Sequence, residues 1–434
     1  MDIYQVGKLK TNPDIQVTVP GSKSITNRAL LMAAMAQGET ILSGVLFSDD
    51  SRYFLQALKD LGFVVDINEE ERCVKVQGLG GRIPKEQAEI YVGSAGTAAR
   101  FLTAFVAMSE GTCLLKASPQ MQKRPMKELL DALRELGAKV QCLEIEDTFP
   151  MEITGIGQMH KNEKEISLNI DRSSQFLSAL LMTAPLRFET LRIRLTGQRS
   201  ARSYVEMTEQ MMKQFGHPGV KKLDENCYEV SNGEYQAQDY PIEPDVSAAC
   251  YFYGMAAITG GKACVQYMRQ DSLQGDMKFL SVLERMGCTL FWQEGQLYLQ
   301  GPETGKLQGI DVDFSDFSDQ TLTLAAIAPY AKEPVTVRNV GHIRGQECDR
   351  LQAIETNLTR MKVRCDIRED GFTIYPSQPQ PAVVKTYEDH RVAMSFALTG
   401  LRAEGIVIEN PSCCRKTFED YFSVLDQVLG ENQG

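Results

Sequence analysis

The segment MKFLSVLERMGCTLFWQEGQLYLQG, residues 277–301, carries the pattern that decides the fold. Apolar residues in its first half stand three and four positions apart, which predicts an amphipathic helix. A small residue, a strand, a turn and a second strand follow, so the segment is a helix followed by a β-hairpin. Four other segments have the same pattern: residues 54–78, 129–155, 205–233 and 350–376. A sixth helix at 418–430 begins it again, but no strands follow.

A second pattern alternates with the first: a helix rich in small residues, a short turn and a β-branched strand. Its six turns fall near residues 38, 111, 189, 261, 333 and 405, at intervals of 72 to 78 residues. A regular interval of this length indicates internal repeats. Chance similarity among amphipathic helices is the alternative, but it does not explain why two helix types alternate in phase. We therefore predict an α/β fold built from six βαβαββ repeats.

The sixth repeat lacks its hairpin, and the start of the chain offers one. Residues 3–19 are interpreted as two strands around a turn at Asn12-Pro13-Asp14, and we expect this hairpin to complete the sixth repeat. The predicted domains are residues 20–241, with repeats one to three, and residues 1–19 plus 242–434, with repeats four to six. Pro20-Gly21 at the first crossing and the two prolines of residues 240–244 at the second are typical of hinges. We expect the domains to open and close over a cleft.

Composition limits the possible partners and the compartment. The chain has 46 Lys and Arg against 57 Asp and Glu, a net charge of −11, which argues against nucleic acid and anionic lipid as partners. Its 11 Cys include no C-x-x-C pair, which indicates reduced thiols rather than disulfides or a zinc site. No run of 18 apolar residues and no signal peptide are evident, so no membrane partner is expected. We expect a cytoplasmic monomer.

Small and polar residues stand at the start of the small-residue helix in every repeat. If three such helices run parallel in each domain, their N-termini gather, and their free N–H groups and dipoles bind anions. Helix capping alone also places Ser and Asp at these positions. Basic residues lie at the same helix starts or in adjoining loops: Lys23, Arg28, Arg100, Arg124, Arg350, Arg391 and Lys416. In an acidic chain, this pattern predicts a small polyanionic substrate with phosphate and carboxylate groups.

The remaining motifs give weaker evidence for a particular chemistry. Residues 21–24, Gly-Ser-Lys-Ser, resemble the end of a phosphate-binding P-loop but lack the order G-x-x-x-x-G-K. The acidic run Asp311, Asp313, Asp316 and Asp319 lacks EF-hand spacing, which favours a solvated loop with one functional Asp over a metal site. The isolated His160, His217 and His342 are interpreted as surface or hydrogen-bonded histidines.

A set of short motifs between residues 20 and 420 resembles the EPSP synthase family, the 3-phosphoshikimate 1-carboxyvinyltransferases, in order and spacing. They are Pro20-Gly21-Ser22-Lys23-Ser24 with Asn27-Arg28, Ala95-Gly96-Thr97-Ala98, Arg124-Pro125, Ser173-Ser174-Gln175-Phe176-Leu177, Gln274-Gly275-Asp276, Asp349-Arg350-Leu351, Asp389-His390-Arg391 and Lys416-Thr417-Phe418. The resemblance implies two inside-out α/β barrel domains, each of three βαβαββ repeats. It also implies transfer of the carboxyvinyl group of phosphoenolpyruvate to the 5-hydroxyl of shikimate 3-phosphate, without metal or cofactor.

The resemblance assigns residues to roles. Asp319 matches the base position, Glu347 matches the acid position, and Lys23 joins them among the catalytic residues. The residues implied to bind shikimate 3-phosphate are Lys23, Ser24, Arg28, Ser173, Ser174, Gln175, Tyr204, Asp319 and Gln346. Those implied to bind phosphoenolpyruvate are Lys23, Ser94, Gly96, Arg124, Gln175, Arg350, Arg391 and Lys416. Two carboxylates suit a reaction that takes a proton from a hydroxyl and delivers one to a methylene carbon.

Three positions depart from the family pattern. Ser94 stands where Asn is usual, Ala201 lies near a substrate-binding Ser, and Gln346 replaces a usual Lys. Ser200 and Ser203 are candidates to replace the hydroxyl missing at residue 201. Arg344 is the candidate to compensate in part for Gln346. Two alternatives stay open. One is the sister enolpyruvyl transferase that acts on a UDP-sugar, which usually has Lys-Asn in place of Lys-Ser at 23–24. The other is a non-catalytic or altered-specificity paralogue that binds a small phosphorylated anion.

Overall fold

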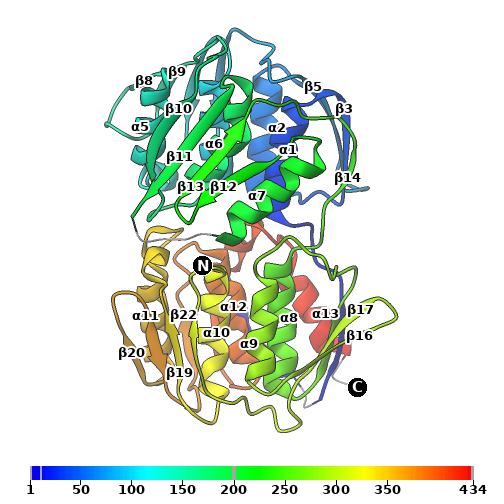
Figure 1. The fold of residues 1–434 in the computed structure, drawn as a ribbon. Helices are drawn as coiled ribbons and strands as arrows, with labels where there is room; N and C mark the ends of the chain where they lie inside the picture. Colours follow the sequence, from blue (N-terminus) through cyan, green and yellow to red (C-terminus); the bar gives the residue numbers. More distant parts are fainter. Residues whose placement is uncertain (1, 10–11, 198–201, 432–434) are drawn as a thin grey trace. The chain divides into compact units, whose positions relative to one another are not determined.

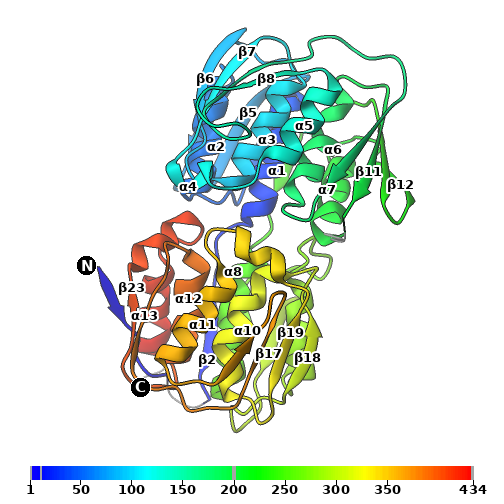
Figure 2. The same ribbon diagram turned by 90° about the vertical axis from the view of Figure 1, so that its left-hand side faces the viewer.

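The computed structural model describes residues 2–9, 12–197 and 202–431, which form a mixed α/β fold (Figure 1 and Figure 2). The chain divides into two compact units. The central unit is Gly21–Ile242, and the terminal unit is Met1–Pro20 with Glu243–Gly434. The boundaries fall after Pro20 and after Ile242, at the two proline-containing crossings.

In the described part of the central unit, the strands form three four-stranded sheets with one pattern of pairing. An edge strand pairs in parallel with the second strand, and the third and fourth strands follow antiparallel. In spatial order the sheets are β14 (Asp239–Pro241), β3 (Gln37–Ser43), β5 (Cys73–Leu79) and β4 (Val64–Asn68); β6 (Gln87–Tyr91), β7 (Thr112–Lys116), β9 (Met151–Thr154) and β8 (Lys139–Cys142); β10 (Lys164–Asn169), β11 (Thr190–Thr196), β13 (Cys227–Ser231) and β12 (Val220–Asp224).

The described strands of the terminal unit form two further sheets of this kind and one of three strands. The four-stranded sheets are β2 (Asp14–Val17), β15 (Lys262–Val265), β17 (Gln296–Gln300) and β16 (Thr289–Gln293); β18 (Ile310–Asp313), β19 (Val335–Arg338), β21 (Phe372–Ile374) and β20 (Cys365–Ile367). The third sheet is β22 (Ala382–Val384), β23 (Ile406–Glu409) and β1 (Ile3–Gln5). Here too the first pair is parallel and the rest are antiparallel.

The helices alternate between two types, as the sequence predicts. In the central unit they are α1 (Lys23–Met35), α2 (Asp49–Asp60), α3 (Gly96–Ala107), α4 (Pro119–Gln122), α5 (Lys127–Leu136), α6 (Gln175–Thr183), η1 (Ala184–Leu186) and α7 (Arg202–Gln214). In the terminal unit they are α8 (Val246–Thr259), α9 (Met277–Arg285), η2 (Ser318–Gln320), α10 (Thr321–Ile327), η3 (Ala328–Tyr330), η4 (Gly341–Gly345), α11 (Arg350–Arg360), α12 (His390–Gly400), η5 (Pro411–Lys416) and α13 (Tyr421–Glu431).

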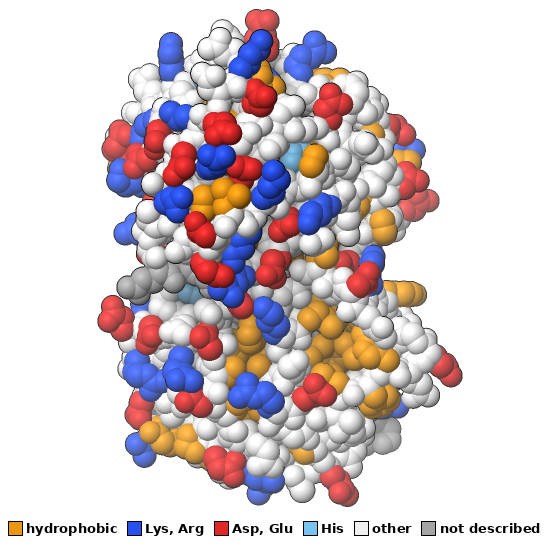
Figure 3. Space-filling view, viewed as in Figure 1, with side chains coloured by type: hydrophobic (Ala, Val, Ile, Leu, Met, Phe, Trp, Pro, Cys, Tyr) orange, Lys and Arg blue, Asp and Glu red, His pale blue; other side chains and the backbone are white. Residues whose placement is uncertain are grey.

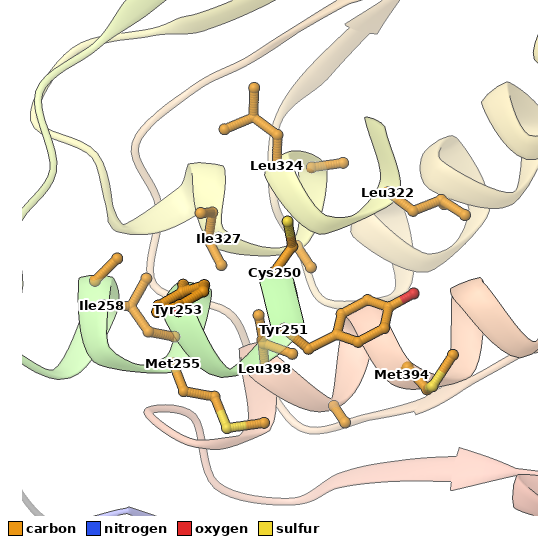
Figure 4. Close-up of a cluster of buried hydrophobic side chains, with 14 of the residues drawn as sticks. Cys250, Tyr251, Tyr253, Met255, Ile258, Leu322, Leu324, Ile327, Met394 and Leu398 are labelled. Carbon is orange, nitrogen blue, oxygen red and sulfur yellow. The ribbon is translucent and has the colours of Figure 1, made fainter. Parts of the chain in front are cut away.

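The small-residue helices are buried on all sides and form the core of each unit. Every residue of α3, α8, α10 and α12 is buried, whereas α2, α5, α9 and α11 bury one face. Figure 4 shows this core in the terminal unit, where Tyr253 of α8, Ile327 of α10 and Leu398 of α12 belong to one cluster of buried side chains. Small residues allow these helices to pack closely, which explains why their sequences lack an amphipathic pattern.

The surface contrasts with these cores. On the face shown in Figure 3, basic and acidic side chains are interspersed. No described helix is both long and apolar enough to span a bilayer.

The prediction of an N-terminal hairpin is wrong. Strand β1 pairs antiparallel with β23, and β2 pairs in parallel with β15, so the two strands lie in different sheets. The eight residues between them are more than a tight hairpin turn needs, and they allow each strand to reach a separate ladder. The second crossing also differs from a simple linker, because its residues 239–241 form β14 and pair with β3. Each unit therefore closes its first sheet with a strand distant in sequence.

Glycines allow the final hairpin strands to touch the ends of the buried helices. A Cβ at Gly301, after β17, would lie 2.1 Å from the carbonyl oxygen of Ala256 in the last turn of α8. At Gly78 in β5 it would lie 2.2 Å from the carbonyl oxygen of Ala33 in α1. Because neither approach is compatible with a side chain, the contact between hairpin and helix requires glycine at these positions.

We predict that Gly301→Ala lowers the free energy of unfolding by about 1–3 kcal/mol or more, because the new methyl group displaces the strand from the helix. Urea denaturation of the full chain measures this change. The control is Gly430→Ala in α13, where a Cβ meets nothing within 4 Å. It should be neutral or stabilising. Equal stability of the two variants would contradict the packing role of Gly301.

Candidate active site

The N-terminal turns of three buried helices meet in the terminal unit. Arg391, near the start of α12, donates from Nη2 to Ser247 Oγ in the first turn of α8 at 3.4 Å. The same nitrogen donates to Asp319 Oδ2 at 2.9 Å, and Asp319 lies in η2 directly before α10. The helix starts of α8, α10 and α12 are therefore joined by one guanidinium group and its acceptors.

Arg350, the first residue of α11, lies beside this meeting point and binds three carboxylates. Its Nε donates to Asp389 Oδ2 at 2.8 Å, its Nη1 donates to Asp319 Oδ1 at 3.1 Å, and its Nη2 donates to Glu347 Oε2 at 3.0 Å. Nη1 also donates to Gln346 Oε1. The side chain is only 2% exposed, so its positive charge is almost entirely shielded from water.

The charges of this cluster shift the pKa of Arg350 upward. Burial acts to lower the pKa of the guanidinium, but the negative charges of Asp389, Glu347 and Asp319 outweigh it, so the net shift is upward. Lys416, at the end of η5, adds a third cation after Arg350 and Arg391, and its Nζ lies 3.6 Å from Glu347 Oε1. The structure thus places Asp319 and Glu347 on the same arginine and brings Arg391 and Lys416 beside them.

A further buried carboxylate, that of Asp276, lies on the α8 and η2 side of this cluster. Asp276 Oδ2 accepts a hydrogen bond from Ser247 Oγ at 2.9 Å, and Oδ1 accepts one from Gln320 Nε2 at 3.1 Å. Burial, followed by the charge of Asp319, raises the pKa of Asp276 to about 6. The sequence analysis includes Asp276 in the motif Gln274-Gly275-Asp276 but assigns it no role, and its position directly before a helix is one where Asp is common as an N-cap.

The N-terminal turns of α1, α3 and α6 meet in the same way in the central unit. Asn27 Nδ2 donates to Thr97 Oγ1 at 2.5 Å, which joins α1 to α3. Arg100 Nη1 in α3 donates to Gln175 Oε1 in α6 at 3.1 Å. Arg28 Nη2 in α1 donates to Ser178 Oγ in α6 at 3.1 Å.

Arg28 differs from Arg350 because its partners are neutral. The guanidinium is fully buried and donates to the hydroxyls of Thr208 and Ser178 and to the carbonyl oxygens of Ser24 and Tyr204. Within the described chain, Arg28 forms no ion pair with a carboxylate. Burial without a counter-charge lowers its pKa to about 10. A positive charge held in this way favours binding of an anion.

Gly96, Ser94 and Arg124 form one group at the start of α3. Arg124 Nη1 donates to the carbonyl oxygen of Ser94 at 3.4 Å. A Cβ at Gly96 would lie 2.6 Å from Arg100 Nη1 and 2.7 Å from Arg124 Nη1. The absence of a side chain at residue 96 therefore allows both guanidinium groups to approach the helix start.

The remaining predicted residues of the central unit lie at or near the same helix starts. Ser174 precedes α6, and Ser173 Oγ accepts from the backbone N–H of Gln175 at 3.3 Å. Lys23 begins α1, and its Nζ lies 3.4 Å from Asp50 Oδ2. The ring of Tyr204 lies 6.0 Å from the Arg28 guanidinium carbon.

The three departures from the family pattern have different outcomes. Ala201 and Ser200 lie outside the described residues. Ser203 is 5% exposed and lies in the first turn of α7. The guanidinium of Arg344 binds Asp349 at 3.0 Å and donates to the backbone carbonyl oxygens of residues 368 and 369, so compensation for Gln346 stays a prediction.

The structure also describes the possible metal ligands and two of the histidines that the sequence analysis discusses. In the part of the chain that the structure describes, no group of three His, Cys, Asp or Glu residues could hold a metal ion. His342 Nε2 lies 2.7 Å from Ser318 Oγ, and His217 is held by the backbone of residues 219 and 231.

The comparison with known families agrees with this geometry. A family model described as EPSP synthase (3-phosphoshikimate 1-carboxyvinyltransferase) matches residues 10–425. The chain belongs to the EPSP synthase family. Relatives in this family include the 3-phosphoshikimate 1-carboxyvinyltransferases of Trichormus variabilis and of a Nostoc species, each 45% identical over 432 residues, which is 99% of this chain and 100% of the relative.

Solved structures show the same fold. An EPSP synthase from Acinetobacter baumannii superposes with a TM-score of 0.80 at 23% identity and covers 99% of this chain and 98% of its own. The enolpyruvyl transferase NikO from Streptomyces tendae superposes with a TM-score of 0.74 at 12% identity, over 98% of this chain and 97% of its own. At these identities the similarity establishes the fold of the EPSP synthase family.

We predict that Arg350→Met destabilises the protein by about 3–5 kcal/mol, because the buried carboxylate of Asp389 and the partly buried ones of Asp319 and Glu347 then lose their shared cation. Urea denaturation measures the loss. Arg360→Met, at the other end of α11, is the matched control. Arg360 is exposed and donates to the carbonyl oxygen of Val383, so we expect a loss below about 1 kcal/mol. Similar losses in both variants would show that the cluster is not a structural element of the unit.

Proposed function

We propose that this chain transfers the carboxyvinyl group of phosphoenolpyruvate to the 5-hydroxyl of shikimate 3-phosphate. The products are 5-enolpyruvylshikimate 3-phosphate and phosphate, in the shikimate pathway of aromatic amino-acid biosynthesis. Membership of the EPSP synthase family supports this activity. The observation that carries it is the meeting of three helix N-termini with buried arginines in each unit, because both substrates carry phosphate and carboxylate groups.

The proposed phosphoenolpyruvate-binding residues come from both units. Arg350, Arg391 and Lys416 supply cations from the terminal unit, and planar guanidinium groups bind carboxylate and phosphate through paired hydrogen bonds. Gly96, with Arg124 and Ser94, supplies the start of α3. Lys23 and Gln175 complete the set and also contact the second substrate. Arg100 fixes the amide of Gln175, because the carbonyl oxygen accepts from Arg100 and the NH₂ group is left to donate.

The proposed shikimate 3-phosphate residues lie mainly at the starts of α1 and α6. Lys23, Ser24, Ser173 and Ser174 provide hydroxyl and ammonium donors for the phosphate group. Arg28 is proposed to add its positive charge to the phosphate site, and Tyr204, whose ring centroid lies 6.0 Å from the Arg28 guanidinium carbon, is proposed to contact the phosphate and the ring. Asp319 and Gln346 extend the set from the terminal unit.

Asp319 and Glu347 are the proposed base and acid. Addition requires removal of the proton from the 5-hydroxyl and delivery of a proton to the methylene carbon of phosphoenolpyruvate. The resulting intermediate then loses a proton from the same carbon as phosphate leaves, which restores the double bond. Both carboxylates bind Arg350, so they are held near one another by a common partner.

The finer features of the fold are also proposals. The uniform pairing of strands supports six βαβαββ repeats, arranged as two inside-out α/β barrels. We propose that the two units are domains that move relative to each other about the crossings. The protein would act as a cytoplasmic monomer that needs no metal or cofactor.

The activity is tested by incubating the purified chain with phosphoenolpyruvate and shikimate 3-phosphate and measuring both phosphate and the enolpyruvyl product. We expect equimolar formation of the two. Parallel reactions contain UDP-N-acetylglucosamine in place of shikimate 3-phosphate. Turnover of the UDP-sugar alone would indicate the sister enzyme, and binding without phosphate release would indicate a non-catalytic paralogue.

We predict that Asp319→Asn and Glu347→Gln each lower kcat by about 10²–10⁴, because each removes a proton-transfer group. Dissociation constants for both substrates, measured by calorimetry, should change much less. Full turnover by Glu347→Gln would overturn the assignment of the acid and direct attention to Lys23 or His390.

Gln346→Lys tests the departure at residue 346. We expect a lower KM for shikimate 3-phosphate by roughly threefold to tenfold with little change in kcat, because the new ammonium adds one charge-assisted contact. Gln346→Met is the control, because it also loses the acceptor for Arg350 but adds no cation. An unchanged or raised KM in the Lys variant would show that residue 346 does not face the substrate.

A further inference from the structure

Asp276 is a buried carboxylate for which helix capping does not account. It directly precedes α9 and is 7% exposed. Its side chain makes no capping hydrogen bond to the helix that it precedes. Both of its oxygens instead accept from side chains of other elements: Ser247 of α8 and Gln320 of η2. The carboxylate is therefore held for its contacts with these elements.

Those contacts connect Asp276 to the proposed base. The Ser247 hydroxyl donates its single hydrogen to Asp276, which leaves its lone pairs to accept from Arg391. Arg391 Nη2 also donates to Asp319. A continuous path of hydrogen bonds thus runs from Asp276 through Ser247 and Arg391 to Asp319. On the other side, Gln320 binds the second oxygen of Asp276 and is the residue next to Asp319 in the chain.

The charge of Asp276 has an effect beyond orientation. Asp319 is bound by two guanidinium groups, those of Arg350 and Arg391, and nearby cations weaken a carboxylate as a base. A second carboxylate opposes that effect. The charge of Asp319 raises the pKa of Asp276, and this repulsion between the two carboxylates is mutual.

The other ionisable groups around Asp276 do not replace it. Arg391 faces it from α12 and acts in the opposite direction, stabilising its charge. Asp245 directly precedes α8 and its carboxylate caps that helix, and Cys250 lies within α8, where burial raises the pKa of its thiol well above its usual range. One oxygen of Asp276 binds Ser247, which contacts Arg391, and the other binds Gln320, which is next to Asp319 in the chain. Asp276 is therefore the carboxylate connected to both Arg391 and Asp319.

We propose that Asp276 is a positioning residue for the reaction. It orients Arg391 through Ser247, and its negative charge makes Asp319 a stronger base. This inference rests on the proposed function, in which Asp319 takes the proton of the 5-hydroxyl. It also explains why a buried acid that costs stability is present in this unit.

The test compares pH profiles of kcat at saturating substrate concentrations. Asp276→Asn and Asp276→Ser remove the charge, and Ser is a favourable residue before a helix. Asp276→Glu keeps the charge. Asp311→Asn is the control, because Asp311 is 58% exposed, pairs with Arg338 in the same unit and also removes one negative charge. Substrate phosphates ionise near pH 6, so only differences between proteins assayed together are interpreted.

We expect the acid limb of both neutral variants to move down by about half a pH unit or more, because Asp319 loses a neighbouring negative charge. Their plateau kcat should fall by roughly threefold to thirtyfold, because Asp319 becomes a weaker base and Arg391 is no longer oriented by a charged Asp276 through Ser247. The acid limbs of Asp276→Glu and Asp311→Asn should stay with the wild type. If kcat falls in the neutral variants while their acid limb coincides with that of the wild type, the proposed effect on Asp319 is overturned.

Melting temperature gives a second readout that does not need activity. The pKa of Asp276 is higher in the folded chain than its ordinary value of 3.8, so its contribution to stability is lost as the pH rises from about 4 through 6. Asp276→Asn and Asp276→Ser have no charge to bury, so they do not lose this stability as the pH rises. Their melting temperature relative to the wild type should therefore be more favourable at pH 7.5 than at pH 4.5, and the reverse order would contradict the buried charge.

If neither neutral variant folds, carbon-13 NMR titration of the wild-type Asp276 and Asp319 carboxyl groups decides. Coupled two-step titrations support the proposal, and independent single steps overturn it. Failure of the proposed function is distinguishable, because the wild type would then release no phosphate. Turnover by the wild type with an unshifted acid limb in the variants rejects only the role of Asp276.

Discussion

The meeting of three helix N-termini in each unit is the constraint that the rest of the site satisfies. Each N-terminus carries free N–H groups and about half a positive charge, so three of them together repel one another unless acceptors are supplied. Asn27 and Thr97, Arg100 and Gln175, and Arg391 and Asp319 are the polar contacts that join these ends. The same excess of positive potential makes the ends suited to bind phosphate and carboxylate groups.

The two units compensate for this charge differently. In the terminal unit, Arg350 binds three carboxylates and Arg391 binds Asp319, so positive and negative groups are interleaved. In the central unit, Arg28 donates to hydroxyls and carbonyl oxygens, and its described partners include no carboxylate. A buried guanidinium without a counter-charge costs stability. We infer that the central unit holds charge for an anionic substrate, whereas the terminal unit also holds the carboxylates that transfer protons.

The periodic parts of the fold were predictable because they depend on local patterns. Alternating buried and amphipathic helices follow from residue spacing, and the sheet hairpins follow from strand and turn signals. The N-terminal hairpin was wrong because the choice of partner strand depends on tertiary packing: β1 and β2 each find a different sheet. Asp276 was missed for a similar reason. Its sequence context resembles a helix cap, and only the folded chain shows that its oxygens bind Ser247 and Gln320 instead.

A crystal structure of the chain with shikimate 3-phosphate and a non-reactive phosphonate analogue of phosphoenolpyruvate tests this account most directly. We expect the anionic groups of both ligands within hydrogen-bonding distance of the N-terminal turns of the buried helices, with Arg28 and Arg391 among their partners. Such contacts would show that the gathered helix starts are the substrate-binding surface. Ligands bound elsewhere, for example at the carboxyl ends of these helices, would contradict the central claim.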